Sequence, residues 1–304
     1  MADETMSLKE VDFVKVPGVP HQFSKTIMPV VAYRNDQIRL LGTCFAISDQ
    51  GLVITARHVL DEAIKIMDWS SDTPPENPWW VGAIYVSEPS EVDDVPDLLG
   101  GILAANRIHT TNLSNGLDIG VMHLNLPVRT SDSKPISLPA LGLSPALPRI
   151  GDHCFSAGYH SMNIHSSANV HTIEQSFSLS SGIIEEIHFP CRDKSSLNFP
   201  CFRTSSRFDS GMSGAPIMAD NGHVIGVVCS SFKLFEEEGY ISYGSLIGPA
   251  LFLKIAATEG EVFLYDFVSG GAIGTDNTIK QLHVHRQDNT LKINFGIPPV
   301  LTGT

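Results

Sequence analysis

Short apolar runs separated by turn residues are the feature that most constrains how this chain can fold. Glycine, proline, serine or aspartate lies between most of the runs, and the runs themselves have the length and composition of β-strands. They occupy residues 28–33, 38–47, 52–55, 79–86, 117–124, 149–159, 177–187, 224–229 and 240–247. Many short strands with few helices predict an all-β protein of the barrel or sandwich type.

Two stretches depart from this pattern and help to divide the chain. Residues 59–67 look like a short helix, and Pro249 opens a second predicted helix through Ala257, because proline is tolerated in a first helical turn. The tail alternates again at 261–268 and 281–295, which predicts an added hairpin. We therefore expect a lead-in (1–27), a main domain (28–260) with an internal boundary near 130–148, and a C-terminal extension (261–304).

Composition excludes several classes of protein. The 42% of hydrophobic residues is enough for a sizeable core, and the net charge of −13 argues against a nucleic-acid partner, which normally needs a basic face. No run of about 18 apolar residues is present, so we expect no membrane-spanning helix. Residues 1–10 are polar and acidic, unlike a secretory signal.

The cysteines and histidines give little sign of a metal or cofactor. The five cysteines are Cys44, Cys154, Cys191, Cys201 and Cys229. They are odd in number, scattered and without a C-x-x-C pair, so we expect free thiols, a cytoplasmic protein and no cofactor. His283 and His285 share one face of a predicted strand and could bind a metal, but an ordinary exposed strand is the simpler interpretation.

The stretch 208–216 carries the strongest chemical signal. Gly211 precedes Ser213 by two positions and Gly214 follows it, so the backbone can turn sharply and aim successive N–H groups into one hollow. Paired donors of this kind stabilise the negative oxygen of a tetrahedral intermediate. Most glycine-rich turns with a serine are simply turns, so the hypothesis needs a general base and an acid that orients it.

His58 and Asp118 have suitable settings for these two roles. His58 closely follows the apolar run 52–55, where an imidazole can be half exposed and still held firmly. Asp118 stands near the start of the run 117–124, so its carboxylate needs a donor. A buried carboxylate that accepts an imidazole N–H fixes the tautomer and steadies the imidazolium.

The order His58, Asp118, Ser213 in a β-rich chain resembles that of the chymotrypsin- and trypsin-like serine peptidases. Four sequence motifs resemble those of the bacterial trypsin-like branch that includes the HtrA/Deg proteases. The resemblance covers about residues 28–257. The four motifs are 42–48, 55–59, 117–121 and 211–216, and residues 181–184 and 220–227 add to the likeness.

The resemblance implies a fold and a set of roles. The implied fold is two six-stranded antiparallel β-barrels with the active site in the cleft between them. Ser213 would be the nucleophile, His58 the general acid–base and Asp118 its orienter, with the N–H groups of Gly211 and Ser213 as the oxyanion hole. The implied function is that of an intracellular serine endopeptidase that cleaves protein or peptide substrates through an acyl-enzyme without a cofactor.

Two departures from the family pattern are visible. Met212 stands where digestive members carry an aspartate that pairs with a freshly cut N-terminus, so we expect no such activation, although a regulatory partner could order the loop instead. HtrA-type proteins add a peptide-binding PDZ domain, and the tail after Ala257 is too short for one. We interpret the tail as structural cover for the second barrel.

The family pattern also suggests a specificity pocket. Its floor would be Arg207, and its wall would be formed by Cys229, Ser230 and Ser231, which favours substrates with an acidic residue at the cleaved position. Phe208 could instead fill the floor and leave a small apolar pocket. Two further interpretations are open. Arg207 could be exposed and take no part in specificity, because arginine is mostly exposed in proteins. The acidic residues 236–238 could also attract basic residues of the substrate.

Two other functions compete with the endopeptidase hypothesis. The first is a catalytically silent trypsin-like scaffold that binds a partner through Trp79 and Trp80 or through the C-terminal hairpin. The presence of all three triad residues and both glycines argues against it. The second is an esterase-like hydrolase, which ranks lower because the nucleophile elbow and chain order of α/β-hydrolases are absent.

Overall fold

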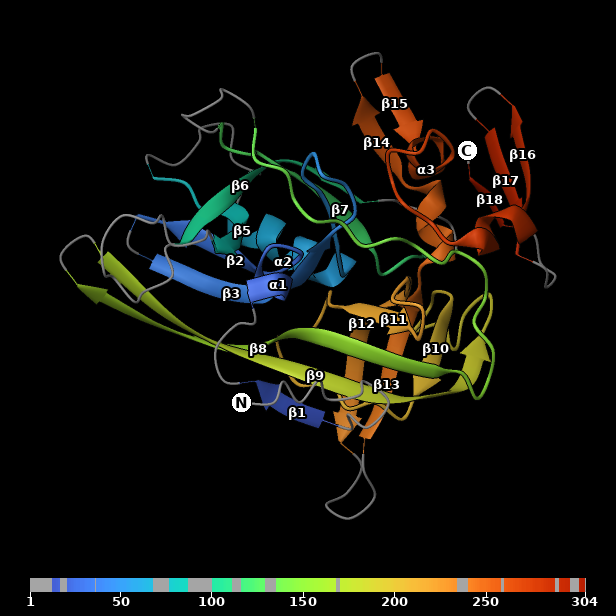
Figure 1. Ribbon diagram of the computed structural model, residues 1–304, viewed down its shortest axis with the longest axis horizontal. Helices are drawn as coiled ribbons and strands as arrows, with labels where there is room; N and C mark the ends of the chain where they lie inside the picture. The colour runs from blue at the N-terminus through green and yellow to red at the C-terminus, as the bar shows by residue number, and fades with distance from the viewer. Residues whose placement is uncertain are drawn as a thin grey trace, which may run out of the picture.

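The computed structural model of the chain consists mostly of strands (Figure 1). It describes residues 13–16, 21–35, 37–67, 77–86, 100–110, 116–128, 135–167, 170–233, 240–257, 260–287, 290–295 and 301–303. Within these residues no helix is long and apolar enough to cross a membrane.

The first half of the chain forms a closed antiparallel barrel. Its strands follow the order β2 (Ile27–Arg34), β3 (Gln37–Ala46), β4 (Leu52–Thr55), β7 (Gly120–Leu124), β6 (Gly100–His109) and β5 (Trp80–Val86). Phe45, Ile54 and Val121 are fully buried in its core. The predicted helix is present as α2 (Arg57–Met67), which buries Val59 and Leu60.

The second half closes a similar ring. Its strands follow the order β8 (His153–Ser167), β9 (Val170–His188), β10 (Cys201–Thr204), β13 (Tyr240–Leu246), β12 (Val224–Lys233) and β11 (Pro216–Ala219). The pairing of β8 with β11 and with β9 completes the ring. The prediction of an all-β fold with two six-stranded antiparallel barrels is therefore confirmed.

One core continues from the first barrel to strands of the second. Tyr159 of β8 and Phe177 of β9 are fully buried and belong to the same hydrophobic cluster as Val30 and Phe45. The rings of Tyr159 and Phe177 meet edge to face, with 5.0 Å between their centroids. In Figure 1 the long hairpin of β8 and β9 extends past the second barrel and runs beneath β2 and β3.

The N-terminal lead-in contributes more than the sequence indicated. β1 (Phe13–Val16) pairs antiparallel with residues 177–180 of β9 and adds a seventh strand beside the second barrel. A short helix α1 (His21–Ser24) then leads into the first barrel, where Phe23 stacks on Phe177 at 6.0 Å. The lack of long periodicity hid β1, because four residues are too few to show one.

The predicted helix over 249–257 is wrong. A 3-10 turn, η2 (Gly248–Phe252), ends at Leu253, whose backbone is extended, and β14 (Lys254–Ala257) follows. β14 pairs antiparallel with β15 (Gly260–Phe263), so strand pairing with residues just downstream prevails over the local helical signal. Ile255 of β14 is also buried, which anchors the strand.

The C-terminal extension holds more than one hairpin. The expected strand over 261–268 is wrong in its second half, because α3 (Leu264–Ser269) follows β15 directly. An added hairpin is present, but, whereas β15 pairs with β14, it lies within 281–295, as β16 (His283–Gln287) and β17 (Thr290–Asn294). β18 (Leu301–Gly303) adds a third strand to it, and η3 (Asn277–Gln281) precedes it.

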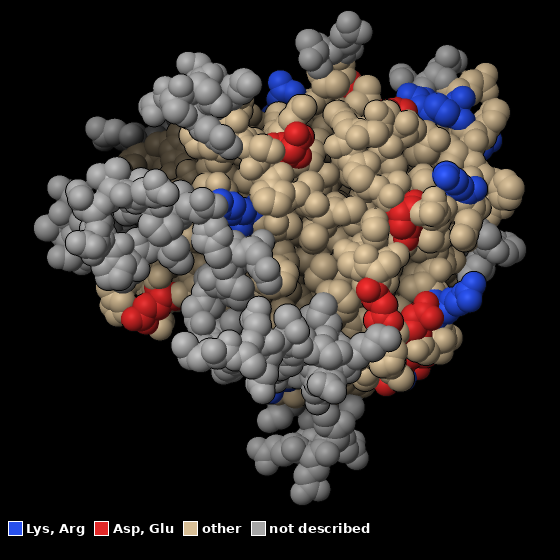
Figure 2. Space-filling view, viewed as in Figure 1, with Lys and Arg blue, Asp and Glu red and all other residues tan. Residues whose placement is uncertain are grey.

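Charged side chains on the face shown in Figure 2 are dispersed. Lysine, arginine, aspartate and glutamate lie interspersed among other residues over the described part of this face. Elsewhere in the described part of the chain, charged side chains pair locally, as Arg203 does with Glu185 at 2.9 Å and with Glu186 at 3.0 Å.

Candidate active site

His58 is the second residue of α2 and lies at the surface of the first barrel. Its side chain is 47% exposed, while the next two residues, Val59 and Leu60, are buried and fix the backbone of the first helical turn. The helix begins directly after β4, which ends at Thr55. The imidazole is thus accessible to a substrate although the backbone that carries it is anchored in the core.

Asp118 holds His58 in two ways. Its Oδ1 accepts a hydrogen bond from the backbone N–H of His58 at 3.0 Å. Nδ1 of the same ring lies 2.9 Å from Oδ2 and 3.1 Å from Oδ1. A carboxylate can only accept, so Nδ1 carries the proton and Nε2 is left as the basic nitrogen.

The backbone around Asp118 differs from the prediction in one detail. The predicted strand over 117–124 begins only at Gly120, so Asp118 precedes β7 instead of lying within it. Leu117 and Ile119 are buried on either side of it, and Asp118 itself is 8% exposed. Burial of both neighbours therefore anchors the carboxylate without a strand pairing at that residue.

The environment of His58 raises the pKa of its imidazole above the ordinary value of 6.5. Burial acts in the opposite direction and lowers the pKa, but the hydrogen bond to Asp118 and the negative charge of that carboxylate outweigh it. Asp61 and Glu62, on the same helix, add to the increase. The site therefore favours the imidazolium, which is the charged form that a general base acquires.

The serine loop of the second barrel is docked onto the first barrel by its backbone. The N–H of Thr43, in β3, donates to the carbonyl oxygen of Ser213 at 2.8 Å. Gly214 has a φ of +89°, and a side chain there would collide with the Thr43 carbonyl oxygen and the Thr55 hydroxyl. Glycine at this position lets the serine loop lie close to the end of β4 at Thr55.

The two predicted oxyanion donors lack an internal acceptor. Gly211 has a φ of +95°, and Met212 donates to the Asp209 carbonyl oxygen at 3.1 Å and accepts from the Ala215 N–H at 2.8 Å. Within the residues that the structure describes, the N–H groups of Gly211 and Ser213 donate to no acceptor. These two donors are thus free to receive a ligand oxygen.

Of the three predicted triad residues, His58 and Asp118 are joined by hydrogen bonds between their side chains. Ser213 is held through its backbone carbonyl oxygen, which accepts from the Thr43 N–H. Over the described residues no hydrogen bond links the Ser213 side chain to His58. Catalytic hydrogen bonds are often long in enzymes without substrate, so the geometry is compatible with a nucleophile and a base that approach each other on binding.

The predicted floor of the specificity pocket is engaged elsewhere. The Arg207 guanidinium forms two hydrogen bonds with the Asp209 carboxylate, at 2.9 Å and 3.2 Å, and lies 4.8 Å from the centroid of the Tyr240 ring. Phe208 is buried in the core of the second barrel. Arg207 therefore has its charge compensated, and the acidic residues 236–238 lie outside the described residues.

The predicted wall residues belong to β12. Cys229 is buried, and its thiol donates to the Tyr243 carbonyl oxygen at 3.1 Å. Burial raises the pKa of this thiol, and the charge of Asp118 raises it further, so Cys229 is not a reactive thiolate. Ser231 shares a hydrogen bond with Ser242 at 3.0 Å, whereas the buried hydroxyl of Ser230 has no partner among the described residues.

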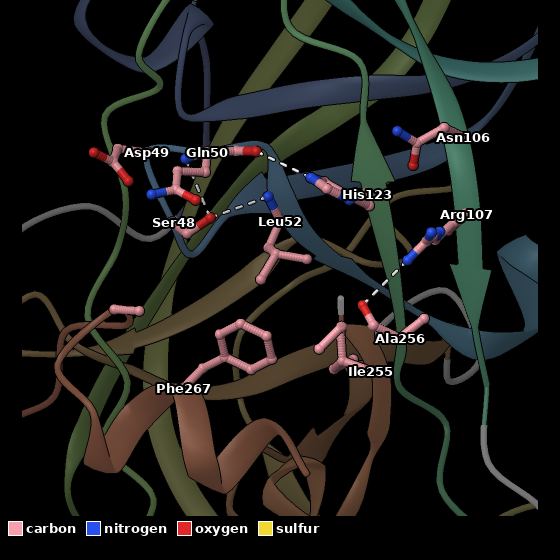
Figure 3. Close-up of a pocket in the computed structure, with 12 residues that line it drawn as sticks. Ser48, Asp49, Gln50, Leu52, Asn106, Arg107, His123, Ile255, Ala256 and Phe267 are labelled. Atoms are coloured by element: carbon pink, nitrogen blue, oxygen red, sulfur yellow. Dashed lines mark hydrogen bonds between the residues drawn. The ribbon is translucent and has the colours of Figure 1, made fainter. Parts of the chain in front are cut away.

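A separate cavity lies away from these residues, between the first barrel and the C-terminal extension (Figure 3). Its volume is about 620 Å³. Leu52 and His123 line it from β4 and β7, at the ends of these strands opposite to His58 and Asp118. Arg107 and Ala256 meet across it, with a hydrogen bond of 3.3 Å from the guanidinium to the carbonyl oxygen.

The two histidines considered as metal ligands lie exposed on β16. His283 is paired with Asn294 and His285 with Lys292 on the neighbouring strand. A lysine ammonium beside a metal site would repel the cation, so this setting does not favour one. The described residues contain no group of three or more potential ligands.

The first barrel thus carries the His58–Asp118 pair, and the second carries the loop with Ser213. The family model of the trypsin-like peptidase domain matches residues 42–227, and the chain therefore belongs to that family. His58, Asp118 and Ser213 all lie within the matched segment. No sequence among the curated proteins matches significantly.

Among solved structures the chain is similar to Deg5. The crystal structure of Deg5 shares 16% sequence identity with it and covers 74% of this chain and 85% of Deg5, with a TM-score of 0.44.

Proposed function

We propose that this protein is a serine endopeptidase that hydrolyses protein or peptide bonds through an acyl-enzyme. The observation that carries the proposal is the His58–Asp118 pair, in which the carboxylate binds both the ring and the backbone of a half-exposed histidine. A carboxylate that holds the imidazole in one tautomer and orientation is the role that the triad mechanism gives to its acid.

The residues would act in the following order. His58 Nε2 takes the proton of the Ser213 hydroxyl while the Ser213 oxygen attacks the carbonyl carbon of the substrate. The resulting oxyanion accepts hydrogen bonds from the N–H groups of Gly211 and Ser213. The imidazolium then gives that proton to the leaving amine as the C–N bond breaks. Water, deprotonated by the same ring, hydrolyses the acyl-enzyme and restores Ser213.

The free backbone donors support this mechanism independently of the side chains. A loop that only made a turn would gain by satisfying its own N–H groups, whereas within the described residues the N–H groups of Gly211 and Ser213 donate to no acceptor. The buried side chain of Met212 lies between the two donors in sequence and packs into the second-barrel core. The loop is therefore ordered by apolar packing, and we propose that it needs no newly cut N-terminus.

We also propose that the protein acts in the cytoplasm. Its five cysteines carry free thiols, and four of them are buried. Free thiols of this kind persist in a reducing compartment.

A catalytically silent scaffold remains the second candidate because Ser213 and His58 share no hydrogen bond in the described chain. Trp80, which is 49% exposed, would offer this scaffold a contact surface. Trp79 is less available, since Arg34 lies 4.7 Å from its ring centroid.

Cleavage of a proteome-derived peptide library separates the two candidates. The full chain should produce new peptide ends with a consistent sequence preference, and His58→Ala should produce none. His283→Ala is the matched control, because it removes an exposed histidine of β16 and should cleave as the unmodified chain does. No cleavage by the unmodified chain, or equal cleavage by His58→Ala, would contradict the proposal.

A further inference from the structure

Thr43 connects both barrels and the serine loop at a single buried point. It lies in β3 of the first barrel and has no exposed surface. Its hydroxyl accepts from the N–H of Tyr159 in β8 at 3.1 Å and lies 3.0 Å from the carbonyl oxygen of Gly211. Its own N–H donates to the Ser213 carbonyl oxygen at 2.8 Å.

The chemistry of the hydroxyl determines the direction of each bond. An amide N–H can only donate, so Thr43 Oγ1 accepts from Tyr159 and keeps its single hydrogen for a carbonyl oxygen. The Gly211 oxygen, at 3.0 Å, is closer than the Tyr159 oxygen, at 3.4 Å, and is the better acceptor. The hydroxyl therefore donates to Gly211.

This bond fixes the peptide unit that follows the first oxyanion donor. The carbonyl oxygen of Gly211 is held by Thr43, while the N–H at the other end of the same peptide, that of Met212, donates to Asp209. Gly211 has a φ of +95°, and glycine explores both signs of φ freely unless its neighbours restrain it. Without the Thr43 hydroxyl, the Gly211–Met212 peptide would have one fewer restraint against rotation.

We propose that Thr43 is a positioning residue, whose hydroxyl holds the oxyanion loop in the conformation that keeps the Gly211 N–H directed at the reacting oxygen. The inference rests on the proposed peptidase mechanism. Thr43 touches neither substrate nor the reacting atoms, and its effect reaches them through Gly211 and Ser213. Within the described residues no hydrogen bond joins Thr43 to His58, so we expect substitution of Thr43 to leave the base unchanged.

The test measures acylation by p-nitrophenyl acetate, a small ester whose reaction needs no knowledge of the natural substrate. Burst-phase kinetics give the acylation rate constant and the dissociation constant of the ester separately. Thr43→Val keeps the shape and removes the hydroxyl, both as donor to Gly211 and as acceptor from Tyr159, and it should lower the acylation rate constant about tenfold or more, with the dissociation constant nearly unchanged. Thr43→Ser restores the hydroxyl and should stay within about threefold of the unmodified chain.

The pH dependence tests whether the substitution acts through the base. The midpoint of acylation against pH should be the same in Thr43→Val as in the unmodified chain, because His58 and Asp118 keep their contacts. Equal acylation rates, or a midpoint that moves with the substitution, would overturn the inference. Failure of the unmodified chain to acylate would instead refute the peptidase proposal itself.

A second pair of variants covers the case in which Thr43→Val does not fold. Thr43→Cys and Thr43→Ser have similar side-chain volumes, but a thiol is the weaker donor. Thr43→Cys should therefore acylate more slowly than Thr43→Ser. Equal rates in two folded variants would overturn the role of the hydroxyl as a donor.

Discussion

The two barrels supply the site by different physical means. In the first barrel the contacts run between side chains: Asp118 binds the ring of His58, and buried neighbours hold both residues in place. In the second barrel the contacts run through the backbone of the serine loop, which Thr43 and Val228 bind at Ser213 and Gly214. Substitutions in the first barrel should therefore act on proton transfer, and those in the second on the conformation of the loop.

The largest effect on activity is expected at Ser213, on which both the base of the first barrel and the loop of the second barrel act. Ser213→Ala should lower peptide hydrolysis by several orders of magnitude, because triad members act as a unit. Its unfolding temperature should be nearly unchanged, since the Ser213 side chain forms no hydrogen bond in the described chain. Rates and thermal melts should be measured on the same preparation, with Ser210→Ala, in the same loop, as the control. Retention of a tenth of the activity would show that Ser213 is not the nucleophile.

Asp118→Asn tests the side-chain contact of the first barrel, between Asp118 and His58. An amide beside Nδ1 favours the wrong imidazole tautomer, so the rate should fall by about 10⁴-fold while the fold persists. Asp61→Asn is the control, because Asp61 also lies near His58 but pairs with Arg57 at 3.5 Å. Steady-state kinetics of the two variants should differ by more than about a hundredfold. Similar rates would mean that Asp118 contributes only charge.

Gly214→Ala tests the backbone packing of the serine loop against the first barrel. The positive φ of +89° alone costs about 1–2 kcal/mol for an alanine, and the collision with Thr43 and Thr55 adds to it. Gly222→Ala is the matched control, because Gly222 has a φ of +77° but no atom within 4 Å of the added methyl group. Denaturant unfolding should show a larger loss of stability for Gly214→Ala, and equal losses would remove the evidence for tight docking of the loop.

A smaller effect is expected on the pH dependence. Only the neutral ring of His58 can accept a proton, so kcat/KM should rise with pH through a midpoint above 6.5, where the raised pKa of His58 lies. The raised pKa has a stability counterpart: the stabilisation from the charged pair is fully present below pH 6.5 and is lost as pH rises through the folded-state pKa.

Removal of the Asp118 charge sharpens that measurement. In Asp118→Asn the residual activity should have a lower midpoint, because burial, which lowers the pKa, is then opposed only by Asp61 and Glu62. Profiles of kcat/KM for both proteins give the two midpoints. An unmodified chain with a midpoint below 6.5 would contradict the assignment of His58 as the base.

The smallest effect is expected at Arg207. Because its guanidinium is bound by Asp209 and is partly exposed, Arg207→Ala should change the relative cleavage of peptides with Glu, Leu or Lys at the cleaved position by less than about threefold. A tenfold loss of glutamate preference would show instead that the Arg207–Asp209 pair opens to bind an acidic substrate.

The sequence predicted the parts of this account that depend on local signals. Strand-length apolar runs predicted an all-β fold, and the glycines around Ser213 predicted a sharp turn, because both signals act within a few residues. The division into two barrels came instead from the resemblance to the trypsin-like peptidases. Thr43 gave no such signal, since its partners Tyr159 and Gly211 are 116 and 168 positions away in the chain. The helix expected over 249–257 failed for a related reason: pairing with β15 decided the structure of β14.

The proposal that Ser213 is the nucleophile is tested most directly by the reaction of the full-length chain with diisopropyl fluorophosphate. One covalent adduct per chain is expected, mapped by peptide mass spectrometry to Ser213, without prior trimming of the N-terminus. The adduct should persist in Ser210→Ala and be lost in His58→Ala, because the serine needs its base to react. An adduct at another residue, an adduct formed only after proteolysis, or equal labelling of His58→Ala would contradict the proposed triad.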